Sequence, residues 1–157
     1  MDFLTGEQQG VDPRRIVLFG RSLGTGPTVE LAATTPGLAG TALLSPLASA
    51  VRTQAGWAAG LLSGMDIFKN IHKVGRIAHP VFIMHGTRDA VVPCSNGRAL
   101  HARLRHPVEP WWCPGAGHNN MPHDEIMQRM GGFVEELRRA PAADDGTYLY
   151  RGGARKS

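Results

Sequence analysis

Residues 15–24 read Arg-Ile-Val-Leu-Phe-Gly-Arg-Ser-Leu-Gly, and this segment decides the fold that the sequence predicts. The apolar run at its start is typical of a strand, and the residues from Thr25 onward favour a helix, with Pro27 tolerated in its first turn. Between the two, Gly20-Arg21-Ser22-Leu23-Gly24 has the form of a nucleophile elbow, a sharp turn that holds one serine strained with its hydroxyl exposed. The flanking glycines permit that turn. An ordinary glycine-rich turn shares this form, so the motif gains weight only from its context.

An acid and a histidine each follow a further apolar run. Asp89 lies in the loop after residues 81–85, and His118 lies in Gly115-Ala116-Gly117-His118-Asn119, after residues 108–113. Ser22, Asp89 and His118 therefore have the chain order of the catalytic residues of α/β-hydrolases, each just past the end of a predicted strand. Because the carboxyl ends of parallel strands converge at one edge of a sheet, we expect the three side chains to share a site.

Chemistry assigns a role to each residue of this set. A serine hydroxyl is a weak nucleophile at neutral pH, so Ser22 needs a positioned base, which a neutral His118 imidazole is predicted to supply. Asp89 is predicted to fix the tautomer of that imidazole and to stabilise the imidazolium as it forms. The backbone N–H of Leu23 is the predicted oxyanion donor. A second donor normally comes from a loop after an earlier strand, and these 157 residues are not expected to contain one.

Strand-like and helix-like segments alternate along the chain, which favours a parallel sheet with right-handed crossovers. The expected strands are residues 15–19, 41–45, 81–85 and 108–113, and the expected helices are residues 25–34, 95–104 and 124–139. We therefore predict an α/β fold, the C-terminal half of an α/β-hydrolase fold with a mostly parallel sheet and flanking helices. This partial domain is assigned to residues 1–140 and a disordered tail to residues 141–157.

Some motifs of the chain are shared with many serine hydrolases, and others are more particular. The elbow and the histidine loop are of the first kind. The segments Leu44-Ser45-Pro46-Leu47-Ala48-Ser49 and Asp66-Ile67-Phe68-Lys69-Asn70-Ile71 are of the second. On these residues the chain resembles, over about residues 4–137, the alpha/beta-hydrolase-domain-containing protein 17 family, whose members remove palmitate from cysteines of membrane-associated proteins.

The resemblance implies that Ser22, Asp89 and His118 form a catalytic triad. It also implies that the sequence corresponds to the C-terminal part of such a protein, because family members carry an N-terminal half with the first strands and a cysteine-rich, acylated leader. The predicted function is thus that of a serine hydrolase, which cleaves acyl thioesters or esters through an acyl-serine intermediate. By resemblance, the reaction is protein S-depalmitoylation.

Two alternatives stay open. The elbow and triad do not distinguish a thioester from an ester or an amide, so a broad carboxylesterase or a serine aminopeptidase-like hydrolase fits the same residues. A truncated, non-catalytic fragment is an alternative of a different class. The expected partners are an acylated protein or a small acyl ester. The expected location is cytoplasmic, with a peripheral membrane contact in a full-length form, and the oligomeric state is left open.

The stretch between residues 45 and 80 is too long to be a simple connection between two strands. Its apolar residues either pack a helix onto the sheet or together line a pocket for an acyl chain, since such pockets are mostly apolar. The candidates for that pocket are Trp57, Leu61, Met65 and Phe68.

Composition excludes several other classes of protein. Two cysteines, Cys94 and Cys113, do not make a disulfide framework and indicate a reducing compartment. The seven histidines are scattered and show no pair at ligand spacing on a credible helix, so we predict no metal and no cofactor. The net charge of +4 comes from dispersed basic residues, which argues against nucleic-acid binding. No run is long and apolar enough to span a bilayer, and no signal peptide is recognised.

Overall fold

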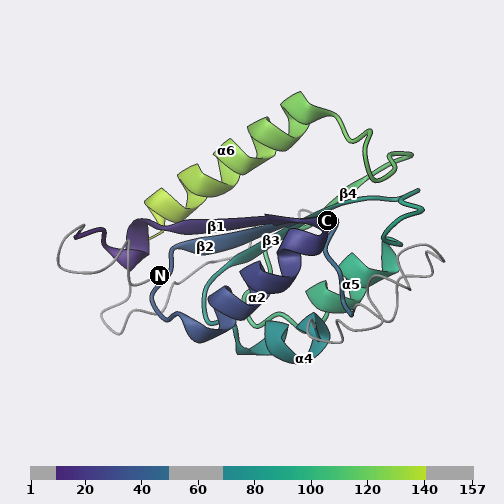
Figure 1. The fold of residues 1–157 in the computed structure, drawn as a ribbon. Coiled ribbons are helices and arrows are strands. Elements are labelled where there is room, and N and C mark those ends of the chain that lie inside the picture. Colours follow the sequence, from purple (N-terminus) through teal and green to yellow (C-terminus); the bar gives the residue numbers. More distant parts are fainter. Residues whose placement is uncertain (1–9, 50–68, 141–157) are drawn as a thin grey trace, which may run out of the picture.

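Four parallel strands and the helices packed on them make up residues 10–49 and 69–140, the parts of the chain that the computed structural model describes (Figure 1). The strands are hydrogen-bonded in the order β1-β2-β3-β4, with ranges β1 Val17–Arg21, β2 Gly40–Leu44, β3 Val81–Gly86 and β4 Trp111–Cys113. The α-helices are α2 Thr25–Thr34, α4 Asn70–Lys73, α5 Ser95–His101 and α6 His123–Arg139, and the 3-10 helices are η1 Pro13–Arg15, η2 Ser22–Gly24 and η4 Val74–Arg76. The predicted α/β class with a parallel sheet is confirmed.

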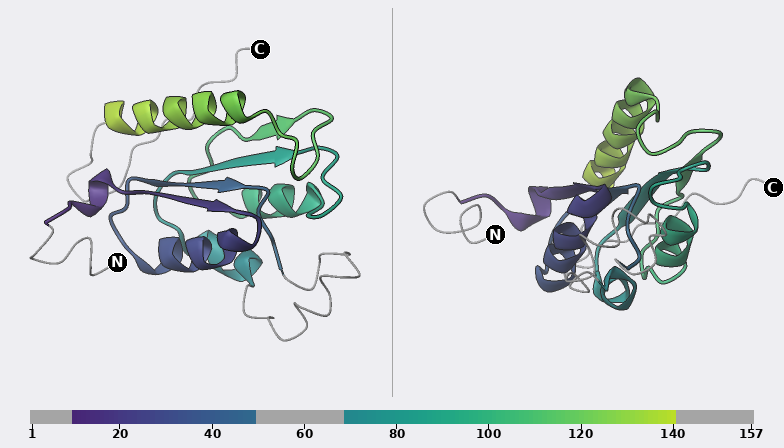
Figure 2. Two further views of the ribbon diagram at one scale, coloured as in Figure 1. Left: turned by 45° about the horizontal axis from the view of Figure 1, so that its top comes forward. Right: turned by 45° about the vertical axis from the view of Figure 1, so that its right-hand side comes forward.

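The core lies in two layers, one on each face of the sheet. Helix α6 covers one face, and α2, α4 and α5 cover the other (Figure 1, Figure 2). Because side chains alternate along a strand, Ala42 and Leu44 of β2 pack in the α6 layer, and Leu43 packs in the opposite layer. The rings of Phe82 and Phe133, with centroids 5.6 Å apart, join β3 to α6.

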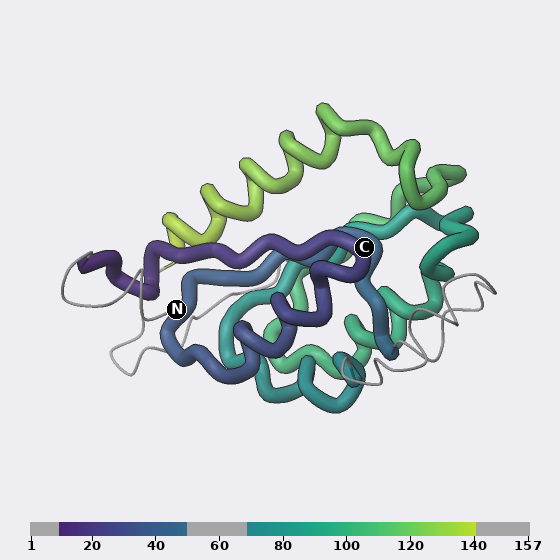
Figure 3. Tube along the Cα trace, viewed as in Figure 1, coloured from purple at the N-terminus to yellow at the C-terminus, as the bar shows by residue number. Residues whose placement is uncertain are grey.

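The inner and outer strands differ in burial. Every residue of β2 and β3 is buried, as expected for parallel strands that helices cover on both faces. Within the described residues β1 pairs with β2 alone, and Phe19 on β1 is 50% exposed. Figure 3 follows the backbone from β1 to the end of α6. The side chains of Phe133 and Leu137 in α6 lie against Gly40 at the start of β2. Strand β1 is therefore a margin of the described sheet.

Three predicted elements have different bounds in the structure from those that the sequence suggested. The strand predicted from residue 108 begins at Trp111, because Pro110 has no backbone N–H to donate to a ladder. The strand predicted from residue 15 begins at Val17, because η1 precedes it, capped by the side chain of Asp12. The helix predicted over residues 95–104 ends at His101. The tail predicted over residues 141–157 lies outside the described residues.

A buried histidine makes the stability of this fold depend on pH. The His79 side chain lies just before β3, and its Nε2 is 2.8 Å from the hydroxyl oxygen of Thr41 in β2. Burial, with a smaller contribution from the nearby charge of His106, lowers the pKa of His79 from 6.5 to about 4. Between these two values the unfolded chain binds a proton that the folded chain does not, so stability falls as pH drops through this window.

We expect His79→Gln to remove part of this acid sensitivity. Wild type should lose about 2 kcal/mol more unfolding free energy than the variant between pH 7 and pH 4.5. Urea titrations monitored by circular dichroism at both pH values measure the difference. The control is His123→Gln, because the His123 side chain is 83% exposed, and it should keep the wild-type slope. Equal slopes for His79→Gln and wild type would contradict the assignment.

Candidate active site

The predicted elbow is present at the end of β1. Strand β1 ends at Arg21, and Ser22 has a backbone φ of 51°, a value that residues other than glycine rarely adopt. The helices η2 and α2 follow at once. The Thr25 hydroxyl donates to the carbonyl oxygen of Ser22 at 2.6 Å and accepts from the backbone N–H of Leu47 at 3.2 Å. Thr25 is fully buried, so it fastens the strained residue to the segment after β2.

The two glycines of the motif have different roles. A Cβ on Gly20 would collide with the Thr28 side chain and lie 3.1 Å from the carbonyl oxygen of Gly24, so only glycine fits there. Gly24 has ordinary helical dihedrals, φ −61° and ψ −15°, and a Cβ on it would have no atom within 4 Å. The sequence suggested that both glycines permit the turn, and the structure shows a steric need only at Gly20.

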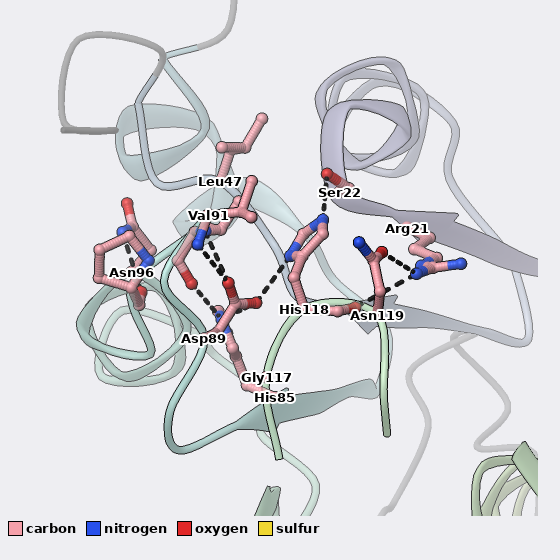
Figure 4. A network of polar contacts seen from close by, with 12 residues as sticks. Arg21, Ser22, Leu47, His85, Asp89, Val91, Asn96, Gly117, His118 and Asn119 are labelled. Carbon is pink, nitrogen blue, oxygen red and sulfur yellow. Dashed lines mark hydrogen bonds and ion pairs between the residues drawn. The ribbon is translucent and has the colours of Figure 1, made fainter. Parts of the chain in front are cut away.

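The three residues predicted to share a site do lie together. His118 Nδ1 is 2.7 Å from Oδ2 of Asp89, and His118 Nε2 is 3.0 Å from Oγ of Ser22 (Figure 4). Ser22 follows β1, Asp89 follows β3, and His118 follows β4, all at the carboxyl ends of parallel strands. With its proton on Nδ1, the imidazole donates to the Asp89 carboxylate and accepts from the Ser22 hydroxyl at Nε2. This arrangement can move a proton away from Ser22 Oγ.

Asp89 is held as a carboxylate despite complete burial of its side chain. Burial alone would raise the pKa of Asp89, but the hydrogen bond with His118 and those from the backbone N–H groups of Val92 and Val91 outweigh it. Together they hold that pKa below its ordinary value. Oδ1 accepts from Val91 at 2.9 Å and from Val92 at 2.7 Å, which leaves Oδ2 to face His118.

The loop that carries His118 is fastened on both sides. Arg21 donates from its guanidinium to the His118 carbonyl oxygen at 3.2 Å and to the Asn119 side-chain oxygen at 3.0 Å (Figure 4). On the other side Gly86 of β3 lies so close to the Ala116 backbone that a Cβ would collide with it. Sequence reasoning missed both residues. Arg21 occupies a position of the elbow motif at which any residue is allowed, so the motif does not indicate its role. Gly86 directly follows the apolar run of residues 81–85, and a glycine there could have indicated that another segment packs closely on the strand.

Of the other predicted site residues, the structure describes Leu23 alone. Leu23 directly follows Ser22 in η2, and the residue is 45% exposed. The pocket candidates Trp57, Leu61, Met65 and Phe68 lie outside the described residues. A cavity of about 350 Å³ adjoins His118 on the α6 side of the sheet. Its lining is Phe19, Arg21, Leu44, His118, Asn119, Met121, His123, Ile126 and Met127.

In the part of the chain that the structure describes, neither the thiols nor a metal-ligand cluster offers a second reactive centre. Cys94 and Cys113 are free thiols, and burial raises the pKa of each, which disfavours a thiolate. Across residues 10–49 and 69–140, no group of three or more His, Cys, Asp or Glu side chains could hold a metal ion. In the same ranges no helix has the length and apolar character needed to cross a membrane.

Solved structures define the class of this fold. No family model matches the chain. A monoacylglycerol lipase from Paleococcus ferrophilus is 23% identical with a TM-score of 0.63, over 83% of this chain and 70% of that one. Acetyl xylan esterase 1 from Thermoanaerobacterium sp. is 18% identical with a TM-score of 0.68, over 86% of this chain and 49% of that one. The described sheet and helices therefore have the α/β-hydrolase fold.

Proteins with higher sequence identity to this chain give a more specific comparison. Alpha/beta hydrolase domain-containing protein 17B of Homo sapiens is 39% identical over 128 residues, 81% of this chain and 44% of that protein. Protein 17C of Xenopus tropicalis is 38% identical over 126 residues, 80% of this chain and 40% of that protein. The chain thus spans less than half the length of these relatives. The resemblance to the alpha/beta hydrolase domain-containing protein 17 sequences is confirmed over the part that matches.

The unequal roles of the two elbow glycines can be tested by alanine substitution. We expect Gly20→Ala to lower stability by about 1–3 kcal/mol through overpacking against Thr28 and to slow labelling of Ser22 by a fluorophosphonate about tenfold or more. The matched control Gly24→Ala should label like wild type and keep its stability within about 0.5 kcal/mol. Thermal unfolding and labelling time courses measure both effects. Equal loss in the two variants would show that the steric argument is wrong.

Proposed function

We propose that the chain is a serine hydrolase that transfers an acyl group from an ester or thioester to Ser22 and then to water. The observation that carries this proposal is the continuous path of two hydrogen bonds, from Ser22 Oγ through His118 to Asp89, at 3.0 and 2.7 Å. The strained backbone of Ser22 and the names of the hydrolase relatives support the same conclusion.

In the first half of the reaction, Ser22 Oγ attacks the substrate carbonyl carbon as Nε2 of His118 takes the hydroxyl proton. The ionised Asp89 stabilises the imidazolium that forms. The backbone N–H of Leu23 donates to the oxyanion of the tetrahedral intermediate. The intermediate collapses when the bond to the leaving thiol or alcohol breaks, and Nε2–H returns the proton to that leaving group.

The second half regenerates the free serine. Nε2 of His118 takes a proton from a water molecule, whose oxygen attacks the carbonyl carbon of the acyl-serine. A second tetrahedral intermediate forms, and its bond to Ser22 Oγ breaks as His118 returns the proton to that oxygen. The product is a carboxylic acid.

Within this class, the substrate we propose is a palmitoyl thioester on a protein cysteine. The support is the similarity to the alpha/beta hydrolase domain-containing protein 17 sequences, at 38–39% identity over about four fifths of this chain. An acylated protein at the cytoplasmic face of a membrane is the corresponding partner. No side chain of the described site separates a thioester from an oxygen ester, so the choice rests on this similarity and is tested by turnover.

The nucleophile is tested by covalent labelling. We expect a fluorophosphonate probe to label the purified chain once per molecule and Ser22→Ala not at all, with unchanged circular dichroism. Ser95→Ala, at an exposed serine at the start of α5, is the matched control and should label like wild type. A folded wild-type chain that does not label would instead favour the non-catalytic fragment.

The leaving group is tested by comparing kcat/KM for a palmitoylated cysteine peptide and for a short-chain acetate ester. We expect the palmitoyl thioester to be the better substrate by about tenfold or more, because each buried methylene of the acyl chain adds to binding. Faster turnover of the acetate ester would support a broad carboxylesterase. Cleavage of an amino-acid amide in preference to both would support an aminopeptidase-like hydrolase.

A further inference from the structure

A second histidine lies directly behind the acid of the site. His85 is the fifth residue of β3, and its side chain has no exposed surface. Its Nε2 is 2.8 Å from the carbonyl oxygen of Val92 and 3.4 Å from Oδ2 of Asp89. Figure 4 shows the His85 side chain next to Asp89, away from Ser22. The reaction as proposed does not use this buried imidazole.

The surroundings determine where the proton of His85 resides. Both neighbours of Nε2 are acceptors, so Nε2 carries the proton and donates to Val92, with Asp89 Oδ2 within reach of the same hydrogen. Nδ1 is buried and has no hydrogen-bond partner among the described residues, so a second proton there would have no acceptor. Burial also lowers the pKa of His85, which favours the neutral ring. The ring is therefore a donor toward the acid loop and not a base.

The contacts of His85 close a ring of interactions around the acid. Val92 donates its backbone N–H to Asp89 Oδ1 at 2.7 Å and accepts the Nε2–H of His85 at its carbonyl oxygen. The imidazole thereby contacts both ends of the turn formed by residues 89–92. It lies at the Val92 carbonyl oxygen and beside Asp89 Oδ2, the oxygen that accepts the hydrogen bond from His118.

The position of the imidazole is itself determined by helix α5. A Cβ on Gly97 would lie 2.6 Å from His85 Nδ1 and 3.1 Å from the Trp112 ring, so α5 approaches the imidazole as closely as glycine allows. An apolar side chain would fill this place without leaving a buried nitrogen unpartnered. The presence of a histidine at this position is explained by the hydrogen bond that its Nε2–H donates to Val92.

We propose that His85 is a positioning residue, whose Nε2–H fixes the Val92 turn and so orients the Asp89 carboxylate toward His118. The inference rests on the proposed function for its catalytic consequence, whereas the geometry it predicts exists without turnover. Loss of the donor should leave Asp89 in place but free to rotate, which loosens the hydrogen bond to His118.

The test compares His85→Leu, which removes the donor, with His85→Gln, whose amide nitrogen reaches the position of Nε2. We expect His85→Leu to lower kcat about 30-fold with KM within about threefold, because misplacement of a catalytic group affects the chemical step. His85→Gln should recover most of that loss. The matched control is His101→Leu, which removes an Nε2 that lies 3.2 Å from the Val108 carbonyl oxygen, away from the triad, and should leave kcat unchanged.

A second readout does not depend on turnover. The proton shared by His118 Nδ1 and Asp89 is followed by proton NMR as a strongly deshielded imidazole resonance. We expect this resonance in wild type and His85→Gln, and its loss or broadening in His85→Leu. Should His85→Leu not fold, His85→Asn takes its place, since its shorter amide cannot reach Val92.

The outcomes separate the two proposals. A wild type that shows the resonance without fluorophosphonate labelling would overturn the proposed function, and the effect of His85→Leu on the resonance would still decide the role of His85. An unchanged resonance and an unchanged kcat in His85→Leu would overturn the positioning role while the hydrolase proposal stands. Loss of kcat in His85→Gln equal to that in His85→Leu would also overturn it, because the donor would then not matter.

Discussion

The buried negative charge of Asp89 is the constraint on which the rest of the site depends. A carboxylate removed from water costs several kcal/mol unless other donors take the place of water. Two of the donors come from the turn after β3, and a third comes from His118, which belongs to a different loop. While it is buried, the acid takes these donors from the loops after both β3 and β4, so the need to stabilise one buried charge also places the imidazole.

The imidazole is placed from its other side by the strand that carries the serine. The Arg21 guanidinium joins the end of β1 to the His118 loop, and Gly86 lets that loop lie directly on β3. The two strands that hold the His118 loop, β1 and β3, are also the strands after which its hydrogen-bond partners Ser22 and Asp89 lie. An error in the placement of one partner would thus displace the base as well.

The fold and the three central residues could be predicted because local sequence determines them. The apolar run before Gly20 and the helix after Gly24 define the elbow, and the order Ser22, Asp89, His118 follows from the ends of parallel strands. Arg21 and His85 could not be assigned in this way. Their roles come from contacts with residues distant in sequence, at places where no motif requires their side chains. Similarly, the extent of β4 depended on Pro110 and the pairing available to it, which an apolar run does not reveal.

The place of β1 at the margin of the described sheet has a consequence for how the site fails. Proteins open locally with free energies that range from near zero at their margins up to that of global unfolding in the core. Ser22 follows a strand that pairs on one side in the described residues, and Asp89 follows a strand buried throughout. Amide protons of β1 should therefore exchange with solvent before those of β3. In such an opening Ser22 would leave His118 while the sheet that holds Asp89 is still intact.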